Sequence, residues 1–170
     1  MHAKLSAIDT QKHTIYSAAI PIVGGASIGA HLRHILDFYS SLYFGVKKGK
    51  INYDARQRNP KIESDLGSGL LQLSTNIEQL AELSRLDNIP VKIFSAIQLN
   101  EELHFEQSNL IRELQSVHSH TTHHMAIIAI ILKLNNMQVD EDFGKAPSTI
   151  QYEQELKSMF ATNTPNRVAL

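Results

Sequence analysis

The chain has 170 residues, with 16 lysines and arginines against 17 aspartates and glutamates, nine histidines and no cysteine. This length is enough for one domain with a buried core, so we expect a single domain over residues 1–170. The near-zero net charge gives no bulk attraction to nucleic acid. The absence of cysteine excludes disulfides, thiolate metal sites and a cysteine nucleophile.

No segment has the length of a membrane span. The longest apolar run, residues 125–132, has eight residues, whereas a membrane helix needs about 20. The N-terminal residues show no apolar stretch behind their positive charge, so no targeting signal is expected. We therefore expect a soluble, cytoplasmic protein with neither a membrane nor a nucleic-acid partner.

Four segments carry apolar residues at intervals of three and four, which predicts amphipathic helices. The first follows the N-cap candidate Ser27 and runs from residue 28 to about residue 46. The second opens at Asn59-Pro60 and continues to about residue 85. The third follows the N-cap candidate Ser108 and runs over residues 109–134, and the fourth begins at Pro147. Residues 2–18 are consistent with a further short helix.

The remaining segments are a loop and a candidate hairpin. Residues 49–59 are polar and predict a loop. Alternating side chains over residues 91–98, a turn at 99–102 and a return strand at 103–106 predict a β-hairpin. Together these patterns predict a mainly α fold, an antiparallel four-helix bundle with one inserted β-hairpin.

Six of the nine histidines fall in two clusters, at positions 31 and 34 and at positions 118, 120, 123 and 124. His120 and His124 are four residues apart, which places both rings on one face of a helix, about 6 Å from each other. That spacing offers two imidazoles to one metal ion. The same face carries Glu113 and several apolar residues, so we expect it to point inward. The alternative is that both histidines hydrogen-bond to backbone, to Glu113 or to water.

The first cluster supplies a candidate third ligand. His34 is followed one turn later by Asp37, which is placed to hold the second ring nitrogen of His34 or to reach the metal itself. A helical wheel does not separate His34 from His31, and both could instead be boundary residues. Three histidines from two packed helices are the ligand set of an open, catalytic-type site. The sequence has no H-E-x-x-H and no phosphate-binding glycine loop, which argues against a metalloprotease and a nucleotide site.

Four segments in order resemble one protein family. They are SIGAHLRHILDFY (27–39), YDARQR (53–58), RELQSVHSHTTHHMAIIA (112–129) and DFGKAPST (142–149). They resemble the DinB-like superfamily of helical-bundle proteins. This resemblance implies a four-helix bundle that holds a divalent metal, zinc or nickel, through three histidines. The matching positions are His34, in an H-x-x-D segment with Asp37, and His120 with His124 in H-x-x-x-H.

The resemblance also implies an activity. Members of this family include bacillithiol and mycothiol S-transferases and a mycothiol-dependent maleylpyruvate isomerase, in which the metal is thought to lower the pKa of a low-molecular-weight thiol cofactor. Tyr53 and Arg56 match a family loop and are candidates for substrate contact. A coordinated thiol becomes a strong nucleophile near neutral pH, and the same open position would activate water.

Two hypotheses follow. The first is a metal-dependent enzyme, a thiol S-transferase or hydrolase acting on a small molecule, with His34, His120 and His124 as ligands and no assigned general base. The second is a non-catalytic, dimeric helical-bundle protein for binding or stress response, whose histidine cluster is structural or vestigial. The predicted hairpin offers an exposed edge, which favours a homodimer under either hypothesis.

Overall fold

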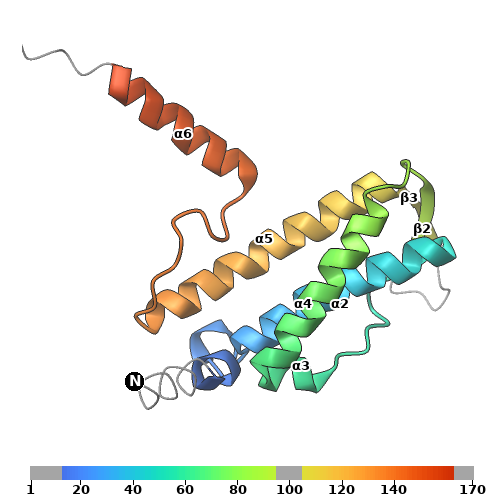
Figure 1. Ribbon diagram of the computed structural model, residues 1–170, viewed down its shortest axis with the longest axis horizontal. Coiled ribbons are helices and arrows are strands. Elements are labelled where there is room, and N and C mark those ends of the chain that lie inside the picture. The colour runs from blue at the N-terminus through green and yellow to red at the C-terminus, as the bar shows by residue number, and fades with distance from the viewer. Residues whose placement is uncertain (1–12, 95–104, 163–170) are drawn as a thin grey trace, which may run out of the picture.

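The computed structural model describes residues 13–94 and 105–162. Within them the chain is mainly helical, with one small three-stranded sheet (Figure 1). Residues 13–17 are helical and precede the 3₁₀ turn η1. The elements are η1 (Pro21–Val23), α2 (Ile28–Lys48), β1 (Lys50–Asn52), α3 (Pro60–Ser64), α4 (Leu66–Leu83), β2 (Pro90–Phe94), β3 (Phe105–Asn109), α5 (Leu110–Leu134) and α6 (Pro147–Thr162).

Helix α2 is the centre of the fold and packs against α3, α4 and α5. It begins as predicted, because the Ser27 hydroxyl accepts a hydrogen bond from the Ala30 amide at 3.0 Å. It ends two residues beyond the predicted boundary, where Gly49 adopts a left-handed conformation with φ 68°. Figure 1 shows α5 lying along α2 and α4 crossing it.

The core consists of two apolar clusters at opposite ends of the α2–α5 pair. One joins the C-terminal half of α2, including Leu42, to the sheet and to Val117 near the start of α5. The other joins the N-terminal half of α2, including Ile35, to the C-terminal half of α5 around Ile131. The two helices are therefore antiparallel, and the histidines lie in the stretch between the two clusters.

The predicted helix over residues 60–85 is wrong in one respect, because it is broken at Asp65. This residue is extended, with φ −125° and ψ 110°, and it closes α3 and opens α4. Its carboxylate accepts a hydrogen bond from the Ser68 amide at 2.8 Å, which is the usual N-cap contact. The apolar spacing of Ile62 and Leu66 continues across the break, so periodicity does not reveal it.

The sheet contains more than the predicted hairpin. Strands β2 and β3 are antiparallel as expected. Strand β3 continues to Asn109, past the predicted end at residue 106, and Asn109 instead of Ser108 caps α5. The predicted start of this strand at residue 103 lies outside the described residues. The predicted turn lies outside the described residues. The loop predicted at 49–59 is wrong in its first part, because β1 pairs in parallel with β2. Gly45 permits this: a Cβ there would lie 2.7 Å from a side-chain carbon of Ile51, so only glycine lets β1 cross α2 closely.

The four-helix bundle remains a prediction. Among the described elements, α2 packs with α3, α4 and α5, whereas α6 extends away from them in Figure 1. None of the side chains described for α6, residues 147–160, is buried. Of the described helices, no single one is long and apolar enough to cross a membrane. His13–Val23 and Ile28–Lys48 meet that criterion only as a pair, bent by 90°.

Candidate metal centre

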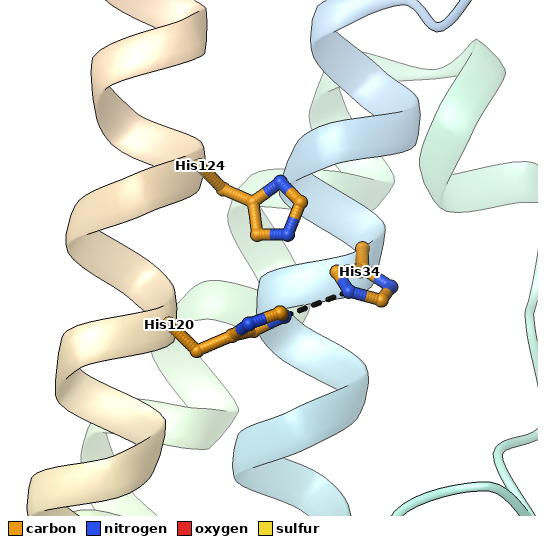
Figure 2. A group of neighbouring side chains, drawn as sticks. All are labelled: His34, His120 and His124. Atoms are coloured by element: carbon orange, nitrogen blue, oxygen red, sulfur yellow. Dashed lines mark hydrogen bonds between the residues drawn. The ribbon is translucent and has the colours of Figure 1, made fainter.

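Three histidines converge between α2 and α5. His34 comes from α2, and His120 and His124 come from α5, and one ring nitrogen of each lies within 4.8 Å of the others (Figure 2). The Nε2 atoms of His34 and His120 are 2.8 Å apart. The antiparallel pairing of the helices thus brings together the three residues that the sequence singled out as ligands.

A fourth histidine supports this group from α2. His31 is buried, and its Nδ1 lies 3.0 Å from Nδ1 of His124. This contact occupies Nδ1 of His124. The other ring nitrogen, Nε2, is turned toward the rings of His34 and His120 in Figure 2 and is the one placed to bind a metal. The helical wheel did not distinguish His31 from His34 as the residue that faces α5. In the structure both do, one turn apart: His31 contacts His124, and His34 contacts His120.

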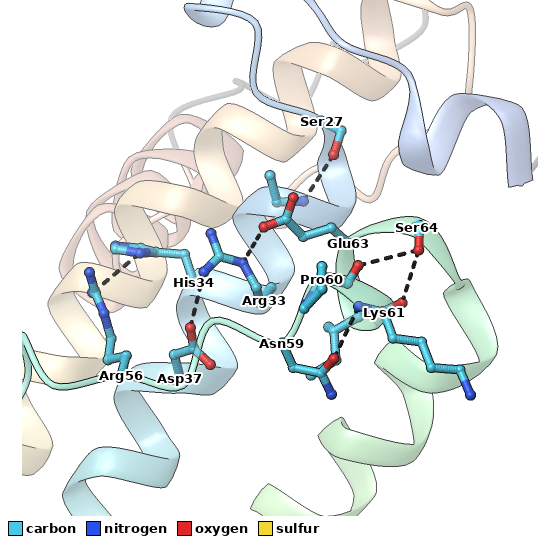
Figure 3. Close-up of polar contacts among 12 residues, drawn as sticks. Ser27, Arg33, His34, Asp37, Arg56, Asn59, Pro60, Lys61, Glu63 and Ser64 are labelled. Atoms are coloured by element: carbon cyan, nitrogen blue, oxygen red, sulfur yellow. Dashed lines mark hydrogen bonds and ion pairs between the residues drawn. The ribbon is translucent and has the colours of Figure 1, made fainter.

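The predicted partner of His34 differs from the observed one. Asp37 was expected to hold the second ring nitrogen of His34, but its carboxylate lies 3.3 Å from Nη1 of Arg33. Arg56 takes the expected place, with its Nη1 3.3 Å from Nδ1 of His34 (Figure 3). Arg56 is half-buried, although it lies in the polar segment 49–59 that the sequence predicts to be a loop.

An aromatic stack forms the next layer around the site. Phe38 lies 4.2 Å from the ring of His120 and is stacked on Tyr53, at 5.1 Å between ring centres and 15° between ring planes. The Tyr53 hydroxyl donates a hydrogen bond of 2.9 Å to the carboxylate of Glu113, whose other oxygen accepts one from Ser108. Glu113 is 3% exposed. Among the described residues, Glu113 makes no contact with the ring nitrogens of the histidines, and its carboxylate is held by Tyr53 and Ser108.

The environment keeps the imidazoles neutral. Burial, helped by the positive charge of Arg56 and by His120, lowers the pKa of His34 to about 4. Burial and the neighbouring rings of His34 and His120 lower the pKa of His124 to about 3. Burial also lowers the pKa of His120 and of His31. At neutral pH the ring nitrogens therefore retain lone pairs, which is the form that binds metal.

The donor set fits a divalent ion of the zinc type. Zinc–imidazole bonds of about 2.0–2.1 Å in tetrahedral geometry place neighbouring nitrogens about 3.3 Å apart. The separation of 2.8 Å between His34 and His120 needs to widen only slightly to reach that value. The buried Nε2 of His31 has no hydrogen-bond partner among the described residues. This histidine therefore keeps one unpaired ring nitrogen next to the three candidate ligands.

One of the three histidines, His120, lines a hollow on the surface of α5. His120 and His123 line a shallow hollow of about 550 Å³ along α5, together with Arg112, Gln115, Ser116 and Ser119. Its other lining side chains are polar. A small molecule can therefore approach His120 from this face.

Comparisons with known proteins do not assign a family. No protein-family model matches the chain, and no solved structure is significantly similar to it. A protein from Rhizopus delemar described as FK506-binding protein 5 is 32% identical over 106 residues, which cover 60% of this chain and 27% of that protein. The chain thus spans about a quarter of the length of this curated relative. The resemblance to the DinB-like superfamily remains a prediction from the sequence.

Proposed function

We propose that this protein is a cytoplasmic enzyme of the DinB-like type that uses one divalent metal ion, zinc or nickel, bound by His34, His120 and His124. The observation that carries the proposal is the convergence of three ring nitrogens within 4.8 Å from two antiparallel helices. Structural histidines do not need to meet in this way, whereas a shared cation requires it. The proposed architecture is the four-helix bundle of that family.

Three protein ligands leave a coordination position for a further group, and a metal there supplies a thiolate or a hydroxide at neutral pH. The chain has no cysteine, so the thiol of an S-transferase would be a separate low-molecular-weight cofactor. The proposed substrate is a small molecule that enters from the hollow beside His120. Within the chain, His31 orients the ring of His124, and the stack of Phe38 on Tyr53 supports the ring of His120.

Arg56 opposes metal binding in its observed position. A guanidinium only donates hydrogen bonds, so its contact with Nδ1 of His34 requires the proton of that ring on Nε2, the nitrogen that faces His120. A metal on Nε2 would move this proton to Nδ1, where two donors would then meet. We therefore infer that a metal bound at Nε2 of His34 would require Arg56 to give up its contact with Nδ1 of that ring.

The experiment is elemental analysis of protein purified without a polyhistidine tag, beside His120→Ala and the matched control His118→Ala. His118 is an exposed histidine on the same helix. We expect about one equivalent of zinc or nickel in the wild type and in His118→Ala, and a loss of metal in His120→Ala. Equal metal content in the two variants, or no metal after incubation with both ions, would refute the ligand assignment.

A second candidate function is a non-catalytic homodimer, and a specific observation favours it. Helix α4 exposes apolar side chains, with Leu71 72% and Ile77 58% exposed, and α6 has no buried side chain among residues 147–160. Such faces are typical of contacts between subunits. Light scattering after size exclusion tests it: a dimer that Leu71→Glu dissociates supports this candidate, and a monomeric wild type excludes it.

A further inference from the structure

Hydrogen bonds determine which nitrogen of the His34 ring carries the proton. Nη1 of Arg56 lies 3.3 Å from Nδ1 of His34 (Figure 3), and a guanidinium has only donors, so Nδ1 accepts. A doubly protonated imidazole has no acceptor, so this ring is neutral and its single proton is on Nε2. Nε2 is the nitrogen that faces His120 across 2.8 Å. A proton therefore occupies the side of His34 that a metal ion would need.

The other two candidate ligands do not have this conflict. Because Nε2 of His34 donates, Nε2 of His120 accepts, and a neutral His120 carries its proton on Nδ1. His124 has its Nδ1 3.0 Å from Nδ1 of His31, and a proton on Nδ1 of His124 satisfies that contact. The Nε2 of His124, turned toward the other rings in Figure 2, then keeps its lone pair. Of the three ligands, His34 alone has to change before a metal binds.

A second contact holds Arg56 beside His34. The guanidinium carbon of Arg56 lies 4.8 Å from the centre of the Phe38 ring, which is a cation–π contact. The Phe38 ring in turn lies 4.9 Å from the His34 ring, measured between ring centres. Within the described ranges Arg56 forms no ion pair, and the carboxylate of Asp37 pairs with Arg33 instead. The guanidinium is therefore directed at the histidine and not at a carboxylate.

We propose that Arg56 is a positioning residue that regulates the metal centre: its contact with Nδ1 keeps the His34 proton on the metal-facing Nε2, and metal binding breaks that contact. The inference rests on the proposed metal function and concerns how the site is filled. When metal binds, one proton leaves Nε2 and one is taken up at Nδ1 of the same ring, so the ring stays neutral and no net proton is released. The contact with Arg56 and the bond to metal therefore exclude each other.

The first measurement uses the wild-type full chain, isotopically labelled, freed of metal with a chelator and then titrated with zinc. Long-range NMR correlations of the histidine ring distinguish a protonated from an unprotonated nitrogen. Without metal we expect His34 to carry its proton on Nε2. With zinc we expect the proton of His34 on Nδ1 and a shifted Nε–H resonance of Arg56.

The second measurement compares zinc affinities by competition with a chromophoric chelator. Arg56→Met removes the donor and keeps much of the side-chain length, so we expect zinc to bind about tenfold to a hundredfold more tightly than in the wild type. Arg58→Met is the matched control, because Arg58 is an exposed residue of the same segment and its substitution removes the same charge. We expect it to keep the wild-type affinity. Melting temperatures of the metal-free variants establish that both are folded.

The outcomes separate this inference from the metal function. If the wild type binds zinc and Arg56→Met binds it no more tightly, the inference is overturned and the metal function stands. The same holds if metal-free His34 carries its proton on Nδ1, or if Arg58→Met tightens binding as much as Arg56→Met, because charge alone would then explain the gain. If no variant binds zinc, Arg56→Met included, the metal function fails and this inference with it. The NMR measurement needs no substitution, so it tests the position of the proton even if Arg56→Met does not fold.

Discussion

The hydrogen bond between Tyr53 and Glu113 is the contact through which the aromatic stack is fixed, and removing it is a sharp test of the site's surroundings. Tyr53→Phe deletes the donor at 2.9 Å from the buried carboxylate but keeps the ring on Phe38. Burial and the neighbouring Glu113 raise the pKa of Tyr53 well above its usual range, so the hydroxyl carries its proton at all ordinary pH values.

The expected cost follows from the chemistry of the pair. A hydrogen bond to a charged group contributes about 1.5–3 kcal/mol, and Glu113 at 3% exposure has little access to replacement water. For a domain of this size each kcal/mol lowers the melting temperature by about 2–4 °C, so we expect a decrease of roughly 3–12 °C. Urea unfolding followed by circular dichroism measures the free energy of unfolding directly.

Tyr152→Phe is the matched control, because Tyr152 on α6 is 60% exposed and its hydroxyl is accessible to water. A surface substitution of this kind changes stability by no more than about 0.5 kcal/mol. If Tyr53→Phe were as mild as this control, the Tyr53 hydroxyl would not stabilise Glu113, and the account of the aromatic stack would fail.

Two further predictions concern packing and pH. Gly69→Ala should destabilise the fold by about 1–3 kcal/mol, because its Cβ would lie 2.5 Å from the Tyr16 hydroxyl. The control Gly67→Ala, whose Cβ would lie 3.6 Å from its nearest neighbour, should be neutral or slightly stabilising. Equal melting temperatures for the two variants would contradict the close contact at Gly69. In metal-free buffer, the free energy of unfolding should fall as pH drops from about 7 to about 4, because the pKa values of His34 and His124 are about 4 and 3 in the folded chain and about 6.5 unfolded, so the unfolded chain takes up more protons in that range. Urea titrations across this range that show constant stability would refute the burial of these rings.

The helices could be predicted from the sequence because their signals are local. The N-cap at Ser27 and the three-and-four spacing after it determine α2 without reference to the rest of the chain. The break at Asp65 was missed because the apolar spacing of the helix continues through it. The only local signal is the single side chain of Asp65, which caps α4. Strand β1 was missed because its pairing depends on backbone groups of β2, 42 residues later in the chain.

The residues of the candidate site also fall into those that local sequence predicts and those that depend on tertiary packing. The pair His120 and His124 could be predicted, since one helix positions both rings. The choice between His31 and His34, and the exchange of Asp37 for Arg56 beside His34, depend on how α2 is rotated against α5 and on where the segment after β1 runs. No periodicity carries that information. The place of α6 could not be predicted either, because an apolar face does not indicate what covers it.

The segment that carries Arg56 has an unusual consequence for how the sequence can vary. Its two ends are anchored, one by the pairing of β1 with β2 and the other by the Asn59 side chain at the start of α3. Surface loops usually tolerate insertions and deletions because their ends can relax. A change of length in this segment would move Arg56 away from its contact with His34. This exposed segment is therefore a place where length, more than residue identity, is constrained.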